Sequence, residues 1–517
     1  MTAQPRSSPL GRYTEIGALS VKVCAAIKRI IIPLAAILVI ESGYLSYSGK
    51  PGSAALLQIG VGVCVALLAW SQSAIGLPLL PMMAVQSLII YGIPIVVGHE
   101  DILIYPAEFV FKAGTEVMVF NLAMVLAWRI GMQIIFPSRP VSYALQEFNR
   151  TGAAGWSRLG FILVVVATAF QVIQGFDFGS AIISSLPSGS SSIVYALLSV
   201  ASACGFFLIS MTVGGNEASP LEKIVFWMLL VANGMIMASG LLLSSAAASL
   251  ITVAIGFFWS NGRIPWRYLT VAMLTLSFLN SGKNTMRARY WPSVDSAGIQ
   301  VSPSAMPSLY AEWAQSSYEA ILADNQPAST LKPGSNAPAI KNQTLLDRVD
   351  NLQNLLFVID AIQAGHAKPL EGQTYTLIPP LLVPRIFWPD KPRTHEGQVL
   401  LNVHFGRQDD ISTFTTYVAW GLLPEAYGNF GALAGSVSLG CVLGMLFAWI
   451  ENLSARKLVV SLEGFLSLNL LMSLMNSFEM VASVLVTATF QSMLVVIGAS
   501  LPFVHRTVTL RRPDDGT

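Results

Sequence analysis

Long apolar runs separated by short polar connections dominate the chain. Each run has about the length that an α-helix needs to cross the hydrocarbon core of a bilayer, roughly 20 residues. The pattern predicts an all-α integral membrane protein with about twelve transmembrane helices. The predicted spans cover residues 30–48, 54–71, 77–97, 112–135, 158–175, 191–213, 221–239, 241–258, 265–281, 432–450, 457–475 and 479–503.

One polar stretch interrupts this pattern, from about residue 283 to 410. It holds about two fifths of all Asp, Glu, Lys and Arg residues of the chain. Within it, residues 309–323 are expected to form a short surface helix. Residues 345–362 have the apolar spacing of an amphipathic helix that lies on the bilayer or at the mouth of the bundle. Residues 375–387 are apolar but contain three prolines, which predicts a broken segment at the interface instead of a span.

The overall composition supports the same class. Hydrophobic residues make up 53% of the chain, charged residues only 11%, and the mean hydropathy is +0.61. A soluble domain does not tolerate this balance. The net charge of +2 gives no sign of a nucleic-acid partner. No disulfide framework is expected, because the four cysteines lie in or beside apolar runs. They are Cys24, Cys64, Cys204 and Cys441.

Basic residues in the short connections set the expected orientation, because cytoplasmic loops of membrane proteins are enriched in Lys and Arg. With the N-terminus inside, every basic short loop is cytoplasmic, and the connections on the other side carry almost no Lys or Arg. Both termini are then cytoplasmic, and the large loop is periplasmic in a Gram-negative cell. The expected segments are a cytoplasmic start 1–29, helices over 30–281, the large loop 282–431, helices over 432–503 and a cytoplasmic tail 504–517.

Motifs of soluble enzymes are missing from the sequence. It has no P-loop, no HExxH and no GxSxG motif, and its histidines and acidic residues lack metal-ligand spacing. We therefore expect chemistry without a metal or another cofactor.

Two groups of cations stand out in the large loop. They are Lys283, Arg287 and Arg289, directly after the ninth predicted span, and Arg385, Lys391 and Arg393, around the broken segment. Arginine suits phosphate because its planar fork donates paired hydrogen bonds and stays charged. The two groups predict a site for a lipid pyrophosphate at the interface. Alternatively, these side chains reach lipid headgroups or pair with nearby Asp residues.

A carboxylate stands at the expected outer mouth of the bundle, in the stretch from Pro424 to Gly431. Glu425 is costly there unless it has a partner. It is expected to orient an acceptor hydroxyl, to act as a general base or to hold an arginine. The structural alternative is that Glu425 is an acidic residue at the start of a helix, close to a Gly-rich turn. Trp388 and Tyr427 are candidates to stack on sugar rings, or to anchor the bundle in the interface.

The most specific pattern of the chain is an ordered set of residues over about 345–435. The order is Arg348, Gly372, Tyr375, Pro384-Arg385, Trp388-Pro389-Asp390-Lys391-Pro392, Thr413, Thr415 and Glu425-Ala426-Tyr427-Gly428-Asn429-Phe430-Gly431. In this order the chain resembles oligosaccharide repeat-unit polymerases of the Wzy type. Elsewhere the resemblance is limited to topology.

The resemblance implies a GT-C-like glycosyltransferase of the bacterial inner (cytoplasmic) membrane. Such an enzyme joins undecaprenyl pyrophosphate-linked repeat units on the outer face into O-antigen, capsule or exopolysaccharide, without a metal or nucleotide sugar. The growing glycan moves from one undecaprenyl pyrophosphate to the terminal sugar of a new lipid-linked unit. The implied partners are this lipid-linked oligosaccharide, membrane lipids, and the flippase and chain-length regulator of the same pathway.

Roles for single residues follow from the implied chemistry, which must neutralise the leaving pyrophosphate and place the acceptor hydroxyl. Glu425 or His404 would orient or deprotonate the acceptor, with a structural loop histidine as the alternative for His404. The expected catalytic residues are Arg385, Lys391 and Glu425, and the expected substrate-binding residues are Lys283, Arg287, Arg289, Arg348, Trp388, Arg393, His404 and Tyr427.

Two other functions share some of these features. An O-antigen ligase also has about twelve spans and a large outer loop, but it transfers finished polymer to a lipid A core. A transporter or flippase would place charges at the bilayer centre and repeat its two halves. The sequence has no clear repeat.

Overall fold

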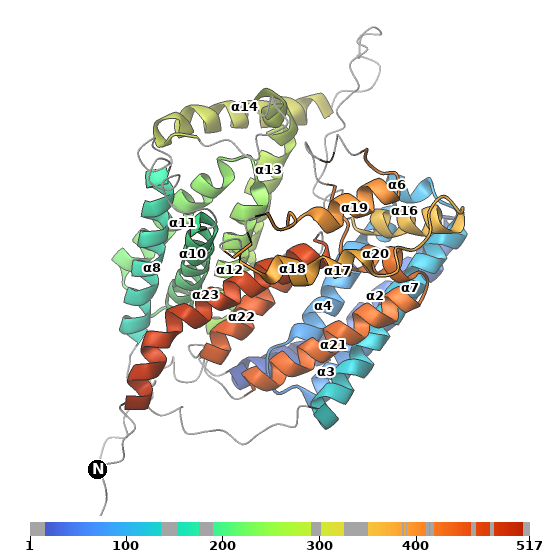
Figure 1. Ribbon diagram of the computed structural model, residues 1–517, viewed down its shortest axis with the longest axis horizontal. Coiled ribbons are helices and arrows are strands. Elements are labelled where there is room, and N and C mark those ends of the chain that lie inside the picture. The colour runs from blue at the N-terminus through green and yellow to red at the C-terminus, as the bar shows by residue number, and fades with distance from the viewer. Residues whose placement is uncertain are drawn as a thin grey trace, which may run out of the picture.

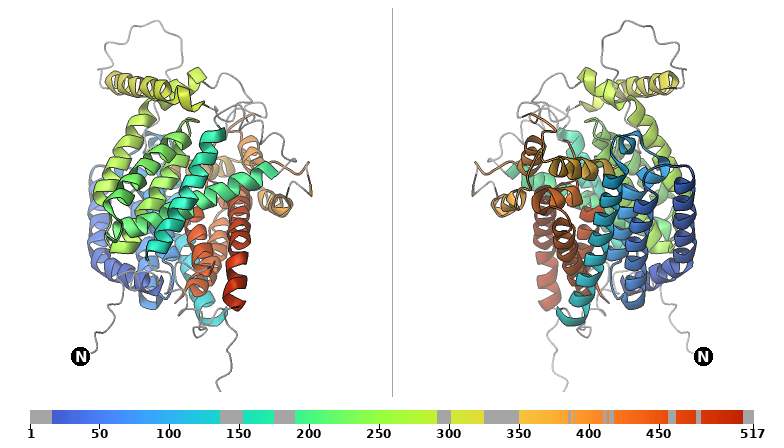
Figure 2. Two further views of the ribbon diagram at one scale, coloured as in Figure 1. Left: turned by 90° about the vertical axis from the view of Figure 1, so that its left-hand side faces the viewer. Right: turned by 90° about the vertical axis from the view of Figure 1, so that its right-hand side faces the viewer.

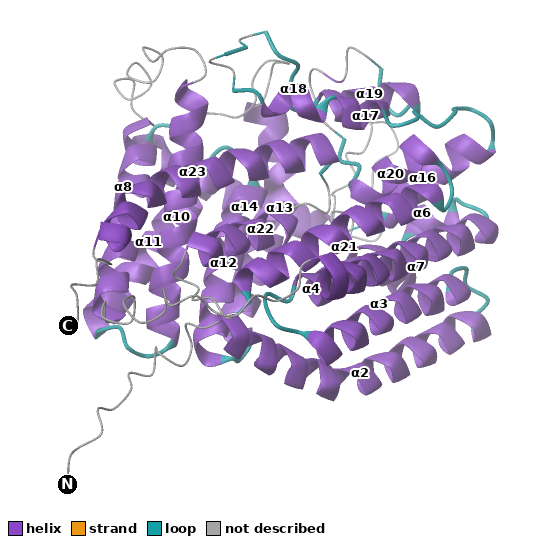
Figure 3. Cartoon of the chain, turned by 60° about the horizontal axis from the view of Figure 1, so that its bottom comes forward, coloured by secondary structure: helices purple, strands orange, loops and turns teal. Residues whose placement is uncertain are grey.

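All regular structure is helical in the part of the chain that the structure describes (Figures 1 and 3). This structure is a computed structural model. It describes residues 16–135, 153–174, 190–290, 301–324, 350–384, 387–388, 390–409, 413, 418–455, 462–475 and 480–509.

The long helices form two groups (Figure 1). In the first group α7 packs between α3 and α21, and α2 packs on α3. In the second group α10 packs against α8 and α12, and α11 packs on α12. The first group consists of α2 (Ile16–Tyr47), α3 (Ser53–Ser73), α7 (Ala107–Ile130) and α21 (Ala434–Ser454), and the second of α8 (Ala153–Gln174), α10 (Ser190–Gly214), α11 (Pro220–Ala238), α12 (Leu243–Asn261) and α13 (Trp266–Tyr290).

Two further helices join these groups. The first, α22 (Leu462–Met475), contacts α21, and the second, α23 (Ala482–Thr509), contacts α22 and α10. One interrupted helix belongs to the first group and consists of α4 (Leu79–Ser87), the π-helical turn η1 (Leu88–Gly92) and α5 (Ile93–Val97). A second π-helical turn, η2 (Gly131–Ile135), extends α7.

Nine helices of the described residues are long and apolar enough to cross a membrane. The chain is therefore an all-helical, multi-pass membrane protein. The three other predicted spans fall on α13, α22 and α23, which do not reach this length or apolarity within the described residues. The first helix also differs from its prediction, because it begins at Ile16 instead of residue 30.

The polar stretch folds into a set of short helices at the end of the bundle away from the start of α2 (Figure 2). We call α14 and α16–α20 the loop layer. Here α14 lies across the ends of the long helices (Figures 1 and 2). The short helices at this end are α6 (Glu100–Leu103), η5 (Pro303–Ala305), α14 (Met306–Asp324), α16 (Leu352–Gln363), α17 (Gln373–Thr376), α18 (Ile378–Leu382), α19 (Glu396–His404) and α20 (Leu422–Phe430).

The sequence predicted some of these short elements. The surface helix expected at 309–323 is α14, and the broken segment expected at 375–387 contains α17 and α18. The amphipathic helix expected at 345–362 is α16 over its second part. Most of its apolar side chains are fully buried, and the helix packs against α7 and α20. This helix therefore lies at the mouth of the bundle and not on the bilayer.

Close contact between α7 and α21 depends on two glycines one helical turn apart. A Cβ atom at Gly440 would lie 2.6 Å from the Phe120 carbonyl oxygen, and one at Gly444 would lie 2.3 Å from the Met124 carbonyl oxygen. Small residues at this spacing let two membrane helices approach closely.

A buried carboxylate near the C-terminal end of α21 joins the helices of the first group at the end away from the loop layer. The side chain of Glu451 is 0% exposed and accepts four hydrogen bonds. One oxygen accepts from the indole N–H of Trp70 (3.0 Å) and of Trp128 (2.8 Å), on α3 and α7. The other accepts from the backbone N–H of Ile75 (3.0 Å) and Gly76 (3.3 Å). Four segments thus meet at one side chain.

We predict that Glu451→Ala destabilises the protein by at least about 3 kcal/mol, because each buried donor left without an acceptor costs about 1–3 kcal/mol. Thermal unfolding of the purified protein in detergent measures this effect. The control is Glu41→Ala, which changes a partly exposed glutamate of α2. Equal unfolding temperatures for the two variants would contradict the role of Glu451.

Candidate functional site

Two segments of the ordered residue set, around residues 370–375 and 425–431, meet in the loop layer. Helix α20 holds Glu425 and Asn429, and α17 holds Thr374 and Tyr375. The backbone N–H of Leu370 donates to the Gly428 carbonyl (2.9 Å). The Tyr375 ring stacks on Phe430, with centroids 5.6 Å apart. Residues about fifty positions apart in the chain are therefore neighbours at the mouth of the bundle.

Glu425 is at the centre of this contact and is 0% exposed. Its Oε1 accepts from the Thr374 hydroxyl (2.8 Å), and its Oε2 accepts from the backbone N–H of Ala482 (2.6 Å). Ala482 is the first residue of α23, where backbone N–H groups lack a partner within the helix. Asn429 donates to the Thr374 hydroxyl oxygen (2.9 Å). The carboxylate thus joins α17, α20 and α23.

Burial sets the ionisation of this carboxyl group. Loss of hydration raises the pKa of Glu425 to about 7, against the opposing effect of the hydrogen bonds from Ala482 and Thr374. Both oxygens already accept from the protein. In this geometry Glu425 holds helices together, and its role in orienting or deprotonating an acceptor hydroxyl stays a prediction.

Lys391 is buried beside α18. Its ammonium donates to the carbonyl oxygens of Leu381 (2.7 Å) and Val383 (2.6 Å). These carbonyls lie at the C-terminal end of α18, where a cation is favourable. Lys391 therefore fixes the broken segment in place. Its contact with pyrophosphate stays a prediction.

The other predicted residues of the loop layer differ in exposure. Arg393 is half-exposed and forms an ion pair with Glu396 (3.2 Å). Trp388 is 43% exposed, which leaves its ring free to meet a sugar or a lipid. The His404 ring donates from Nε2 to the Lys368 carbonyl (2.8 Å), which fits the structural alternative. Tyr427 is buried in α20, so its ring is not available for stacking on a sugar.

The cations of α13 form a separate group. Arg287 donates to the Leu241 carbonyl (2.8 Å), between α11 and α12. Arg289 pairs with Glu312 of α14. Lys283 is 1% exposed. In Figure 2, α13 and α18 lie on different sides of the bundle. The two groups that the sequence predicts as one pyrophosphate site are thus apart among the described residues.

Two predicted site residues, Arg348 and Arg385, lie outside the described residues. Sequence reasoning missed Thr374 and Arg407. Arg407 donates to the Asn354 amide oxygen (2.5 Å) and lies over the Phe357 ring of α16. A threonine or an arginine in a polar loop gives no signal of its own, because its partners are distant in the sequence.

Metal ligands are not gathered in this region. Across the residues that the structure describes, no group of three His, Cys, Asp or Glu side chains lies close enough to hold an ion. The arrangement can offer cations, an exposed tryptophan and a rigid frame of hydrogen bonds.

We predict that stability falls as pH rises through 7, because the raised pKa of Glu425 makes the folded state bind a proton that the unfolded state has released. The contribution is complete below the ordinary pKa of 4.5 and is lost above about 7. For one proton the slope is at most about 1.4 kcal/mol per pH unit. Unfolding temperatures between pH 5 and 8 measure it.

Glu425→Gln should flatten this dependence, since the amide does not titrate. The half-exposed Glu396 gives the control, Glu396→Gln, which should keep the slope of the wild type. A slope in Glu425→Gln as steep as in the wild type would exclude Glu425 as its source.

We predict that Lys391→Met loosens α18, because two carbonyl oxygens then lose their donor. Limited proteolysis between residues 377 and 395 should be at least about fivefold faster than in the wild type. Lys368→Met, at an exposed position of the same layer, is the control. If the two variants are cleaved at equal rates, the ammonium does not hold this segment.

Comparison with protein-family models, with curated proteins and with solved structures finds no match to this chain.

Proposed function

We propose that this protein polymerises oligosaccharide repeat units that are linked to undecaprenyl pyrophosphate, in a bacterial inner membrane. The observation that carries the proposal is the meeting of the resemblance segments. The Glu425-to-Gly431 stretch, Thr374 and Tyr375 form one hydrogen-bonded and stacked unit. A lipid-linked substrate is compatible with a bundle of membrane-spanning helices that carries a layer of short helices at one end.

The proposed reaction requires positive charge near the leaving group and a correctly positioned acceptor. Pyrophosphate is a good leaving group, so catalysis needs cations near the developing charge and an acceptor hydroxyl held in line with the anomeric carbon. Arg385 and Arg393 are the proposed pyrophosphate contacts, with Lys391 holding the segment between them. Trp388 is the proposed sugar contact. Glu425 is proposed to act indirectly, because it holds α17 and the start of α23 in place beside the site.

The proposal includes twelve crossings, both termini in the cytoplasm and a GT-C-like plan. The described helices support an alternating path. The connections after α2, α5 and α11 and the loop layer lie at one end of the bundle, and those after α3, α10 and α12 lie at the other. The second end carries basic residues such as Arg129 and Arg263, as cytoplasmic loops do.

We predict that deletion of the gene leaves single repeat units on lipid and removes the ladder of long surface polysaccharide. Arg385→Ala should fail to restore the ladder at wild-type protein level, because pyrophosphate loses a paired donor. A gel of surface polysaccharide with an analysis of lipid-linked sugars gives the result.

Lys368→Met is the control that should restore the ladder. Long polymer accumulating on the lipid carrier in the deletion strain would identify a ligase instead. An unchanged ladder in that strain would reject both functions.

A further inference from the structure

The end of α13 next to the loop layer contains a fully buried lysine side chain. Lys283 is 1% exposed, and within the described residues its ammonium has no hydrogen-bond partner. Burying an ammonium without a partner costs several kcal/mol. Such a group needs an explanation, and a missing anionic ligand is one.

The element packed on this end of α13 is α14. It packs along α13, where the backbone of Gly282 approaches Ser317 so closely that a Cβ atom at Gly282 would lie 2.6 Å from the Ser317 nitrogen. Buried Met286 and Trp313 belong to the apolar cluster at this contact. Lys283 follows Gly282 in α13, so it lies at the level where α14 packs on this helix.

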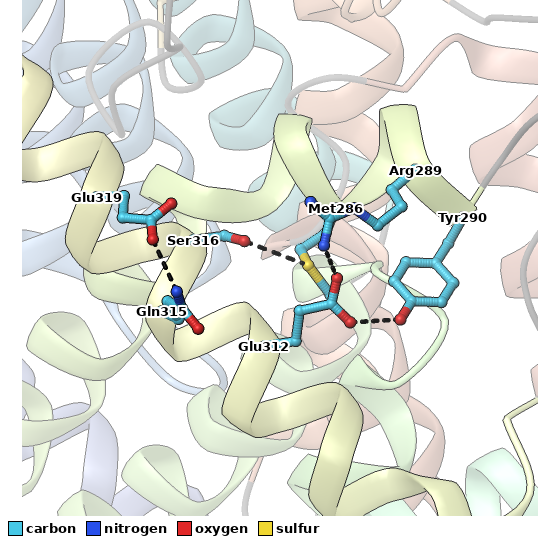
Figure 4. Close-up of polar contacts among 7 residues, drawn as sticks. All are labelled: Met286, Arg289, Tyr290, Glu312, Gln315, Ser316 and Glu319. Atoms are coloured by element: carbon cyan, nitrogen blue, oxygen red, sulfur yellow. Dashed lines mark hydrogen bonds and ion pairs between the residues drawn. The ribbon is translucent and has the colours of Figure 1, made fainter.

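An acidic side chain of α14 holds a neighbouring cation (Figure 4). Glu312 pairs with Arg289 through one oxygen and accepts from the Tyr290 hydroxyl through the other. Within α14 all charged residues are acidic, whereas the last two turns of α13 carry only basic ones. The Glu312 carboxylate therefore occupies a position that an anionic ligand of α13 would need.

We propose that the end of α13 binds a lipid-borne phosphate or diphosphate, and that α14 covers this site with Glu312 in place of the anion. When α14 moves away from α13, Lys283 and Arg289 become available to bind the anion. The proposal uses the proposed function only to name polyprenyl diphosphate as the ligand to try first.

A cross-link between α13 and α14 tests the cover. The Met286 sulfur and the Ser316 oxygen are 3.7 Å apart, so the pair Met286→Cys and Ser316→Cys can be bridged by a short bis-thiosulfonate reagent. The full chain is placed in phosphatidylcholine nanodiscs with radiolabelled undecaprenyl diphosphate. Bridging should lower its affinity by at least about tenfold, and a reductant should restore it. The two single-cysteine variants are controls. Equal affinity in the bridged protein would overturn the proposal.

Two pairs of variants test the charges. Glu312→Gln should raise the affinity about fivefold, while Glu319→Gln should leave it unchanged, because Glu319 contacts Gln315 of its own helix. Lys283→Met should lower the affinity about tenfold, and Lys283→Arg should keep most of it in a protein that folds. Equal affinities within either pair would also overturn the proposal.

Competition identifies the source of the phosphate. If phosphatidylglycerol displaces the label as well as unlabelled undecaprenyl diphosphate does, the site takes phospholipid headgroups. If undecaprenol, which has no phosphate, displaces it equally well, the anion is not recognised and the proposal fails. The two proposals can fail separately. If the cross-link lowers the affinity but deletion of the gene leaves the surface polysaccharide unchanged, the binding site stands and the proposed function is rejected.

Discussion

Buried carboxylates that accept backbone N–H groups at helix starts hold this bundle together. Glu451 binds the connection between α3 and α4. Glu116 accepts from the Leu433 N–H at 2.9 and 3.1 Å, where α21 begins, and from the Ser436 hydroxyl. Glu425 binds the first N–H of α23. A membrane offers no water to these donors, so a carboxylate at each helix break satisfies them.

The same constraint positions the loop layer. Helix α20 lies between the Glu116 contact, which fixes the start of α21, and the Glu425 contact, which fixes the start of α23. Neither end of α20 can shift without separating a carboxylate from its donors. These two contacts therefore hold α20 in place on the bundle, as the proposed positioning of a lipid-linked substrate requires.

The cations of the two predicted groups do different things. Lys391 satisfies carbonyl oxygens of its own segment, whereas Lys283 is covered and has no such contact within the described residues. Arg393, just before α19, pairs with Glu396, the first residue of that helix. Arg289 of α13 pairs with Glu312 of α14. The cations that already have a partner gain an anion only by exchanging that partner for it.

The sequence by itself determined the all-helical membrane class, the concentration of polar residues in one stretch, the short helix α14 and the break in the apolar segment 375–387. These depend on apolar length, amphipathic spacing and proline, which act over neighbouring residues. Only the tertiary structure decided that Glu425 bridges α17 and α23, that Lys391 binds carbonyls and that α13 and α18 lie apart. Those outcomes depend on contacts between residues tens to hundreds of positions apart, and no local pattern encodes the partner of a buried charge.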